Sequence, residues 1–130
     1  MYEKTTDKIN VKVEPNYLTE QSSPDENHFV WSYHVTIKNE GHSTIQLTSR
    51  HWKITDAHGI TQEIQGDGVI GEQPILNPGE IFEYTSGAPL RTPTGFMVGN
   101  YTMQGPEGMI FTVDIPAFSL DSPYQNKVLN

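Results

Sequence analysis

The chain has 130 residues and no cysteine, so a single domain over residues 1–130, without disulfide bonds, is expected. Eight Lys and Arg residues face sixteen Asp and Glu residues, and the formal net charge of −8 disfavours binding to nucleic acid or to anionic membranes. No apolar run follows a basic N-terminal region, and no segment reaches the roughly 18 apolar residues of a membrane-spanning helix. We therefore expect a cytoplasmic protein with no membrane insertion.

The first predicted strand follows a polar start. Residues 1–7 are polar and are expected to form a loose terminus. Residues 9–13 alternate apolar and polar side chains, which is the period of a half-buried strand. Pro15 is expected to end this strand or to leave it at a sheet edge.

Residues 29–38 have the most regular alternation in the chain and predict a central strand. Trp31 and Tyr33 lie on its apolar face and are expected to be buried. Residues 39–41, Asn-Glu-Gly, predict a hairpin turn after this strand.

The strand predicted at residues 45–54 contains an irregularity. Apolar residues occupy odd positions at its start and even positions at its end. A strand with one apolar face cannot change parity without an extra residue, so a β-bulge is expected within residues 48–51. Residues 60–65 predict a short, mostly polar strand at an edge.

Three further strands complete the pattern. Residues 81–86 and 96–103 predict the first two, and residues 109–120 predict the third. In this last strand the apolar residues change parity after Pro116. Residues 121–130 form a polar tail that is expected to be loose.

These segments predict an all-β fold. About seven short strands are punctuated by eleven glycines and nine prolines, and no segment has a persuasive helical period. This pattern is typical of an immunoglobulin or fibronectin type III-like β-sandwich.

A glycine-rich loop near the middle of the chain supports two interpretations. Gly66, Gly68 and Gly71 have the GxGxxG spacing of loops that bind pyrophosphate. That fingerprint opens a helix whose terminal amides hold phosphate, and the prolines that follow exclude such a helix here. We therefore expect a structural crossover between sheets. The alternative is a phosphate- or nucleotide-binding protein in which Arg50 assists the loop.

The leading functional hypothesis is a partner-binding surface. The bulge, the glycine loop and the end of the strand at residues 81–86 are expected to converge, and loops on a rigid sandwich commonly carry function. The candidate contacts are Arg50, His51, Tyr84 and Ser86. In the structural alternative, Arg50 pairs with Asp67 or Glu72 and only fastens the loop.

No catalytic residue, cofactor or metal ligand is predicted. The five histidines are scattered, and without cysteine they do not form a zinc-binding pattern. Ser86 does not lie in a nucleophile elbow, so no enzyme activity is assigned. A weak hydrolase and a divalent-metal carrier are the minor alternatives.

Five segments resemble the bacterial ApaG family. They are FVWSYHVTIKNEG at residues 29–41, IQLTSRHWKITDAHG at 45–59, GDGVIGEQPILNPGEIFEYTSG at 66–87, TGFMVGNY at 94–101 and FTVDIPAF at 111–118. The chain departs from the family at residues 95–99, where GFMVG replaces the usual GTMQG. The resemblance implies an immunoglobulin- or fibronectin-like sandwich and a loose association with cobalt and magnesium tolerance.

Similar domains occur in eukaryotic F-box proteins and in a polymerase-interacting protein. The resemblance therefore implies a non-enzymatic binding or regulatory module with an unknown protein partner. A weak homodimer is a further expectation.

Overall fold

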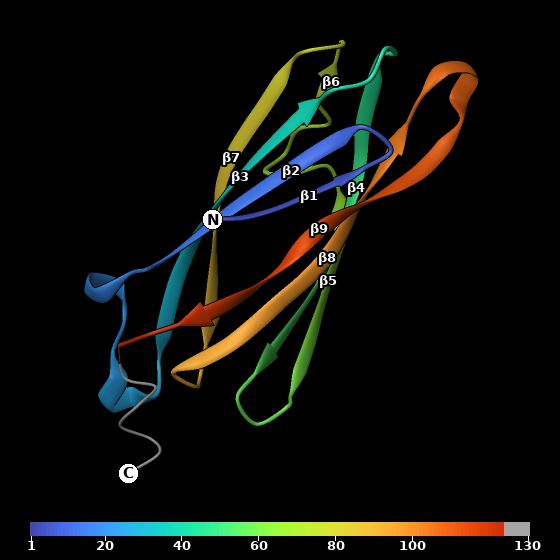
Figure 1. The fold of residues 1–130 in the computed structure, drawn as a ribbon. Helices are drawn as coiled ribbons and strands as arrows, with labels where there is room; N and C mark the ends of the chain where they lie inside the picture. The colour runs from blue at the N-terminus through green and yellow to red at the C-terminus, as the bar shows by residue number, and fades with distance from the viewer. Residues whose placement is uncertain (124–130) are drawn as a thin grey trace.

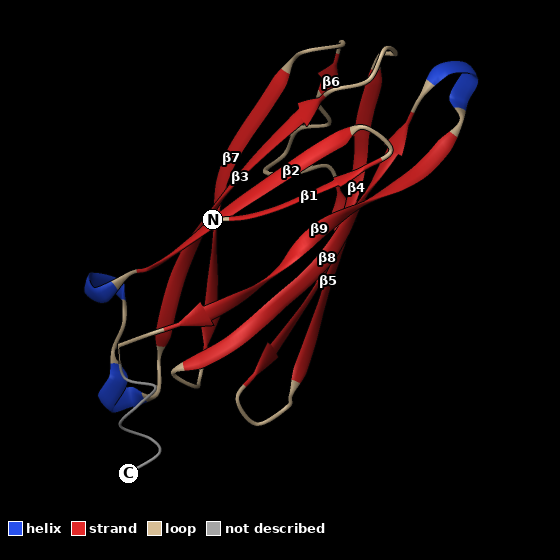
Figure 2. Cartoon of the chain, viewed as in Figure 1, coloured by secondary structure: helices blue, strands red, loops and turns tan. Residues whose placement is uncertain are grey.

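Strands make up most of the structure, a computed structural model that describes residues 1–123 (Figure 1). The only helical elements of this part are three 3₁₀ turns in the connections, at Thr19–Gln21, Pro24–Glu26 and Pro106–Gly108 (Figure 2). No helix in the described part is long and apolar enough to cross a membrane.

The strands form two antiparallel sheets that pack as a β-sandwich. The four-stranded sheet has the order β1 (Tyr2–Thr6), β2 (Ile9–Tyr17), β3 (Phe29–Asn39) and β7 (Ile81–Leu90). The five-stranded sheet has the order β5 (Thr61–Asp67), β4 (Ile45–Asp56), β8 (Thr94–Gln104) and β9 (Ile110–Asp121), and β6 (Ile75–Leu76) also pairs with β4. The all-β sandwich is thus confirmed, and β1 and β6 are the strands that the sequence analysis does not predict.

The core lies between the inner faces of the two sheets. β3 pairs with β2 on one side and β7 on the other, so its predicted central position is confirmed. Its odd-numbered residues are buried from end to end, including Trp31 at 1% exposure and Tyr33 at 6%. The Trp31 Nε1 group donates a hydrogen bond to the main-chain oxygen of Asp121 at 2.9 Å, which joins the two sheets across the core.

Both parity changes in the sequence are β-bulges. In β4, Leu47 pairs with Met103 and Ser49 pairs with Thr102, so Thr48 is an extra residue and the predicted bulge is confirmed. In β9 the register also shifts, with two residues of β9, Pro116 and its neighbour, opposite one residue of β8. Each extra residue returns the apolar side chains that follow it to the core.

The prediction of a loose start is wrong, because residues 2–6 form β1. This strand pairs with residues 9–13 of β2, and the Asn10 Nδ2 group donates to Glu3 Oε2 at 2.8 Å and to Thr5 Oγ1 at 2.9 Å. The strand is mostly exposed at a sheet edge, so backbone pairing rather than apolar alternation defines it. β1 begins at Tyr2, opposite Val13, so the later part of β2, with Pro15, lies at an edge as the sequence allows. At the other terminus, Asp121 ends β9 and Ser122 is buried, whereas residues 124–130 lie outside the described residues.

Two predicted connections are also wrong. Residues 39–41 do not form a hairpin, because both edges of β3 are already paired and the chain must cross to the other sheet to begin β4. The glycine loop is not a crossover, because it joins β5 to β6 and both strands pair with β4. The crossing to the four-stranded sheet comes later, at the Asn77-Pro78-Gly79 turn before β7.

The two lateral sides of the sandwich differ. On the closed side, β1 and β2 lie against β9, and Lys4 Nζ is 2.9 Å from Asp114 Oδ2. On the open side, the edge strands are β5 of one sheet and β7 of the other, and these two strands are not paired.

Candidate functional site

The open side is the candidate site because the five-stranded sheet extends beyond its partner there. Gln62 and Ile64 of β5 pair with Ile54 and Trp52, which are core residues, so all four side chains belong to the inner face. Yet Gln62 is exposed and Ile64 is 40% exposed. Within the described residues, no strand of the four-stranded sheet covers the inner face of β5.

The bulge in β4 turns Arg50 toward this gap. Past the extra residue Thr48, Arg50 has the parity of the buried Trp52, so its side chain lies on the inner face. The Nη1 group donates hydrogen bonds to the main-chain oxygens of Asp67 at 3.1 Å and Gly68 at 2.9 Å. Arg50 therefore fastens the bulge to the glycine loop through neutral acceptors.

The structural alternative holds in part: Arg50 fastens the loop and Asp67 is one of its partners, but the contact is to a main-chain oxygen and is not an ion pair. None of the ion pairs among residues 1–123 includes Arg50. Asp67 follows Gly66, the residue opposite Arg50, so its side chain projects to the outer face. The guanidinium instead packs over Gly66, where a Cβ atom would lie 2.9 Å from Nη1. Gly66 is thus needed for the close approach of the arginine.

Three tyrosines from both sheets lie near this guanidinium. The hydroxyl groups of Tyr84 and Tyr101 are hydrogen-bonded to each other, and the Tyr33 hydroxyl is hydrogen-bonded to Ser86. Burial raises the pKa of all three phenols and outweighs the opposing effect of the Arg50 charge. All three are therefore neutral at physiological pH, and their buried hydroxyl groups lie beneath the open side.

The glycine loop is a tight turn whose amides are largely used within the protein. Gly68 N donates to Thr48 O at 2.8 Å, and Val69 and Glu72 exchange two main-chain hydrogen bonds at 2.8 and 2.9 Å. The turn has φ of 44° at Ile70 and 80° at Gly71, so both central residues are left-handed. This geometry explains the glycines without a ligand.

His51 lies on the opposite face of the sheet from Arg50, because adjacent strand residues project to opposite faces. Its Nε2 atom is 3.8 Å from Glu63 Oε2 and has no hydrogen-bond partner within residues 1–123. His51 borders an open, polar depression of about 450 Å³ with Ser49 and Asn100, and Arg50 also lines it. The side chains of Arg50 and His51 therefore project to opposite faces, although both residues border this depression.

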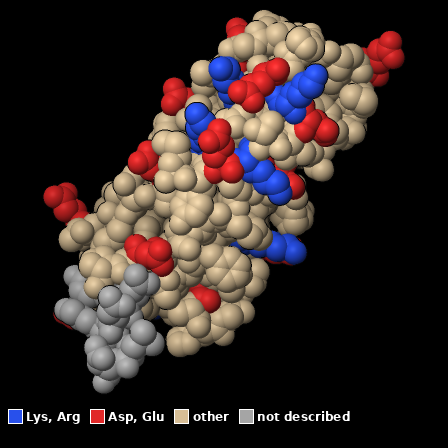
Figure 3. All heavy atoms as spheres, in the orientation of Figure 1, with Lys and Arg blue, Asp and Glu red and all other residues tan. Residues whose placement is uncertain are grey.

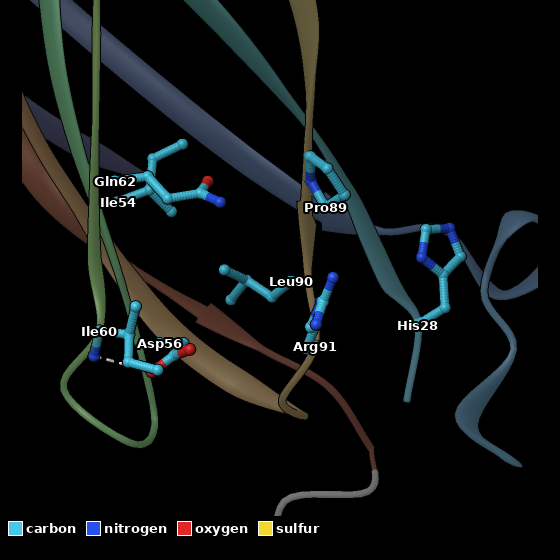
Figure 4. Close-up of a pocket in the computed structure, with 8 residues that line it drawn as sticks. All are labelled: His28, Ile54, Asp56, Ile60, Gln62, Pro89, Leu90 and Arg91. Carbon is cyan, nitrogen blue, oxygen red and sulfur yellow. Dashed lines mark hydrogen bonds between the residues drawn. The ribbon is translucent and has the colours of Figure 1, made fainter. Parts of the chain in front are cut away.

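A cavity that the sequence analysis does not predict lies farther along the open side. It has a volume of about 360 Å³ between the end of β7 and the β4–β5 hairpin. Figure 4 shows Leu90 of β7 facing Ile54 and Gln62 across this space. Ile60, which is 63% exposed, and Arg91 also line it. Asp56 lines it as well, so this cavity adds a recess with both apolar and polar walls and side chains of both charges to the site.

The structure brings only some of the predicted residues together. Arg50, Gly66 and Gly68 are in contact, whereas Gly71 lies in the loop with open space around it. Tyr84 is only 5% exposed, so the prediction that it contacts a partner is wrong. Its side chain lies in the core beneath the open side. Ser86 is half-buried on the inner face of β7.

Of the residues that the sequence analysis missed, Arg91 could have been found from composition. The chain has only two arginines, Arg50 and Arg91, among many acidic residues, and both lie on the open side. Ile64 gave no signal, because its exposure follows from the unequal width of the sheets.

The charges elsewhere do not form a second site. On the face shown in Figure 3, basic side chains lie among acidic ones instead of forming a continuous basic patch. Among residues 1–123, no group of three or more His, Asp or Glu side chains is arranged to hold a metal ion.

Comparison with known proteins identifies relatives along the whole chain. Residues 19–105 match the family model described as the ApaG domain. A protein from Parvibaculum lavamentivorans named Protein ApaG is 58% identical over 130 residues, which is 100% of both chains. A protein of the same name from Rhodospirillum centenum is 60% identical over 124 residues, or 95% of each chain. A crystal structure of a Bordetella pertussis protein designated ApaA superposes with a TM-score of 0.87 at 46% identity, covering 95% of this chain and 98% of that one.

Proposed function

This chain belongs to the ApaG family, and we propose that it is a non-enzymatic interaction module that binds a partner protein at the open side of its sandwich. One observation supports the proposal above others. The Arg50 guanidinium, held by main-chain oxygens alone, lies beside the uncovered inner face of β5 that carries the exposed Ile64. Arginines next to apolar surface are common at interface hot spots, and an arginine without a carboxylate partner attracts an acidic group.

The proposal assigns no reaction to the site. Ser86 carries a hydroxyl on the inner face of β7, and it is hydrogen-bonded to the Tyr33 phenol. Burial raises the pKa of that phenol, so Tyr33 does not act as a base toward Ser86 at neutral pH. His51 lies on the outer face of the other sheet and does not complete a nucleophile and base pair.

The experiment compares Arg50→Ala with Lys53→Ala, a matched loss of positive charge on the outer face of the same strand. Lys53 is exposed and its Nζ is 3.7 Å from Glu63 Oε1, so its removal should change folding little. Each variant is immobilised and used to capture proteins from the native host, and its thermal melting is measured. We expect Arg50→Ala to lose a captured protein that Lys53→Ala retains, at a temperature where the melting curves show both variants to be folded.

Two results would contradict the proposal. Unchanged capture by Arg50→Ala would show that the open side is not the binding surface. Equal loss by both variants would show that capture depends on net charge alone. If the captured protein is a second copy of the chain, the module is a homodimer instead of a receptor for another protein.

Phosphate or nucleotide binding is the second candidate, because the Arg50 guanidinium lies directly beside Gly66 and Gly68. The engaged amides of the loop weigh against it. Thermal melting with pyrophosphate or ATP tests the idea, since a ligand at 100 times its Kd adds about 2.7 kcal/mol of stability. Mg²⁺ and Co²⁺ are included in the same series to test the metal-carrier alternative.

We further propose that the interaction takes place in the cytoplasm. Any effect on cobalt and magnesium tolerance would act through the partner, because the described residues offer no metal-binding cluster. The likeness to immunoglobulin and fibronectin type III domains likewise stays a prediction beyond the sandwich itself.

A further inference from the structure

The free edge of β7 exposes a row of backbone groups. Val30 of β3 is opposite Pro89, and it uses both its main-chain groups on the side of β2. Its oxygen accepts from Leu18 N at 2.8 Å, and its nitrogen donates to Ser22 Oγ at 2.9 Å. Pairs alternate along an antiparallel ladder, so the odd-numbered residues of β7 direct their N–H and C=O groups away from the sheet. Those residues before Pro89 are Ile81, Glu83, Thr85 and Gly87.

Pro89 marks where this edge ends. A proline has no N–H group, and at an outward-facing position it breaks no bond to β3. The pairable edge therefore covers residues 81–87. Within the described residues no other strand pairs with it.

The two sheets end unequally beside this edge. The four-stranded sheet stops at β7, whereas the other sheet continues to β5, whose inner face is uncovered. A strand added to β7 would lie beneath β5 and cover Ile64. A strand added to the free edge of β5 would extend away from the sandwich and bury much less apolar surface. The geometry therefore favours β7 as the acceptor.

Positive charge lies at two points along this space. The Arg50 charge opposes the rise in the pKa of Tyr84, near the middle of β7, and Arg91 directly follows the strand. The seven residues from Tyr84 to Arg91 span about 23 Å in extended chain. Neither arginine forms an ion pair within residues 1–123. The cavity near Leu90, which is lined by Asp56 as well as by Arg91, lies between β7 and the β4–β5 hairpin on the same side.

We infer that the partner contributes an extended peptide segment that adds as a strand to the free edge of β7 beneath β5. This inference rests on the proposed function and specifies its mode. Alternate side chains of the segment are apolar and face Ile64 and the cavity lined by Ile60 and Leu90. Carboxylates toward its two ends face Arg50 and Arg91. Main-chain hydrogen bonds supply affinity and the alternating side chains supply selectivity, as in other cases of strand addition.

The probe is a displayed library of random ten-residue peptides selected on the full chain. We expect enriched peptides to alternate apolar and polar residues and to carry Asp or Glu near both ends. Hydrogen exchange with a synthesised peptide should slow the amides of Glu83, Thr85 and Gly87 and leave those of Tyr84 and Ser86 unchanged. Failure to enrich any peptide, or protection without this alternation, would overturn the inference.

A pair of variants at one position isolates the backbone. Thr85→Pro removes an outward N–H group, and Thr85→Ala keeps it, while both lose the 2.8 Å contact between Thr85 Oγ1 and His34 Nδ1. We expect Thr85→Pro to bind the peptide at least tenfold more weakly than Thr85→Ala, with similar melting temperatures.

The variants also separate this inference from the proposed function. If both Thr85 variants bind equally while Arg50→Ala weakens binding, the open side binds a partner but strand addition is wrong. If neither Thr85→Pro nor Arg50→Ala changes binding, both ideas fail. Slowed exchange at the three odd-numbered amides that depends on protein concentration, without peptide, would instead identify a second copy of the chain as the occupant.

Discussion

On the closed side of the sandwich, β1 lies beside β9 and the two sheets are joined by side chains. The Tyr2 and Phe118 rings are 6.0 Å apart, and Lys4 pairs with Asp114. On the open side, β5 and β7 do not pair with each other, and Ile64 is 40% exposed although it lies on the inner face. The same strand alternation therefore produces core on one side and accessible surface on the other. The difference is the number of strands available to cover each inner face.

This comparison separates residues that stabilise the fold from those that serve the surface. The largest expected effect is that of Trp31→Ala. Trp31 is 1% exposed and donates to Asp121 O, so its loss leaves a cavity and removes a link between the sheets. We expect urea denaturation to show a loss of about 3–5 kcal/mol in the free energy of unfolding. A loss below about 1 kcal/mol would mean that the core is not centred here.

Gly68→Ala tests the connection between the core and the open side. Gly68 has φ of +64°, and a Cβ atom there would lie 2.2 Å from Glu72 O. Left-handed strain and the steric clash together should cost about 2–4 kcal/mol in urea denaturation, with no nucleotide present.

The control for this prediction is Gly71→Ala. Gly71 has φ of +80° but open space around its Cβ position, so this change should cost only about 1–2 kcal/mol of strain. Equal losses would show that the clash at Gly68 is relieved. A Gly68→Ala protein of unchanged stability that lost affinity for pyrophosphate would favour the phosphate-binding alternative.

The buried phenols make the region beneath the open side sensitive to alkali. Burial raises the pKa values of Tyr33, Tyr84 and Tyr101 in the folded protein above the usual value of about 10. Above pH about 10 the unfolded chain therefore binds fewer protons than the folded chain, and stability falls as pH rises. Each phenol that stays protonated contributes a loss of about 1.4 kcal/mol per pH unit.

Urea denaturation between pH 8 and pH 11.5 checks this slope. The variant Tyr101→Phe keeps the ring and removes one buried hydroxyl, so its stability should fall less steeply above pH 10. Identical slopes for the two proteins would show that Tyr101 does not contribute to the pH dependence.

The sequence predicted every long strand that has an apolar face. Alternation identified six of the strands, whereas β5 was predicted as a mostly polar edge strand. The parity changes located both irregularities, because an apolar face must stay on the core. β1 was missed because its mostly exposed residues show no such face. The supposed hairpin after β3 was wrong because turn residues report a change of direction but not the sheet that the next strand joins.

The candidate site was predictable only at its centre. The bulge indicated Arg50, and the structure places it against Gly66 and Gly68. Which face His51 occupies and how deeply Tyr84 is buried depend on register and on the opposite sheet. The free edge of β7 depends on strand order, which alternation along a single segment does not encode.

The smallest expected effect is that of Ile64→Thr, and it tests the comparison most directly. Ile64 is on the inner face of β5 but 40% exposed, and threonine keeps the β-branch that strands favour. We expect the free energy of unfolding to change by no more than about 0.5 kcal/mol in urea denaturation.

The matched variant is Ile115→Thr on β9, where the isoleucine is 4% exposed on the closed side. There the lost apolar contact and the buried hydroxyl should cost about 2–4 kcal/mol. If Ile64→Thr costs as much as Ile115→Thr, the inner face of β5 is already covered in solution and the open side is not a free surface. A small cost, together with weaker binding of the selected peptide, would show that the uncovered part of the inner face serves binding instead of folding.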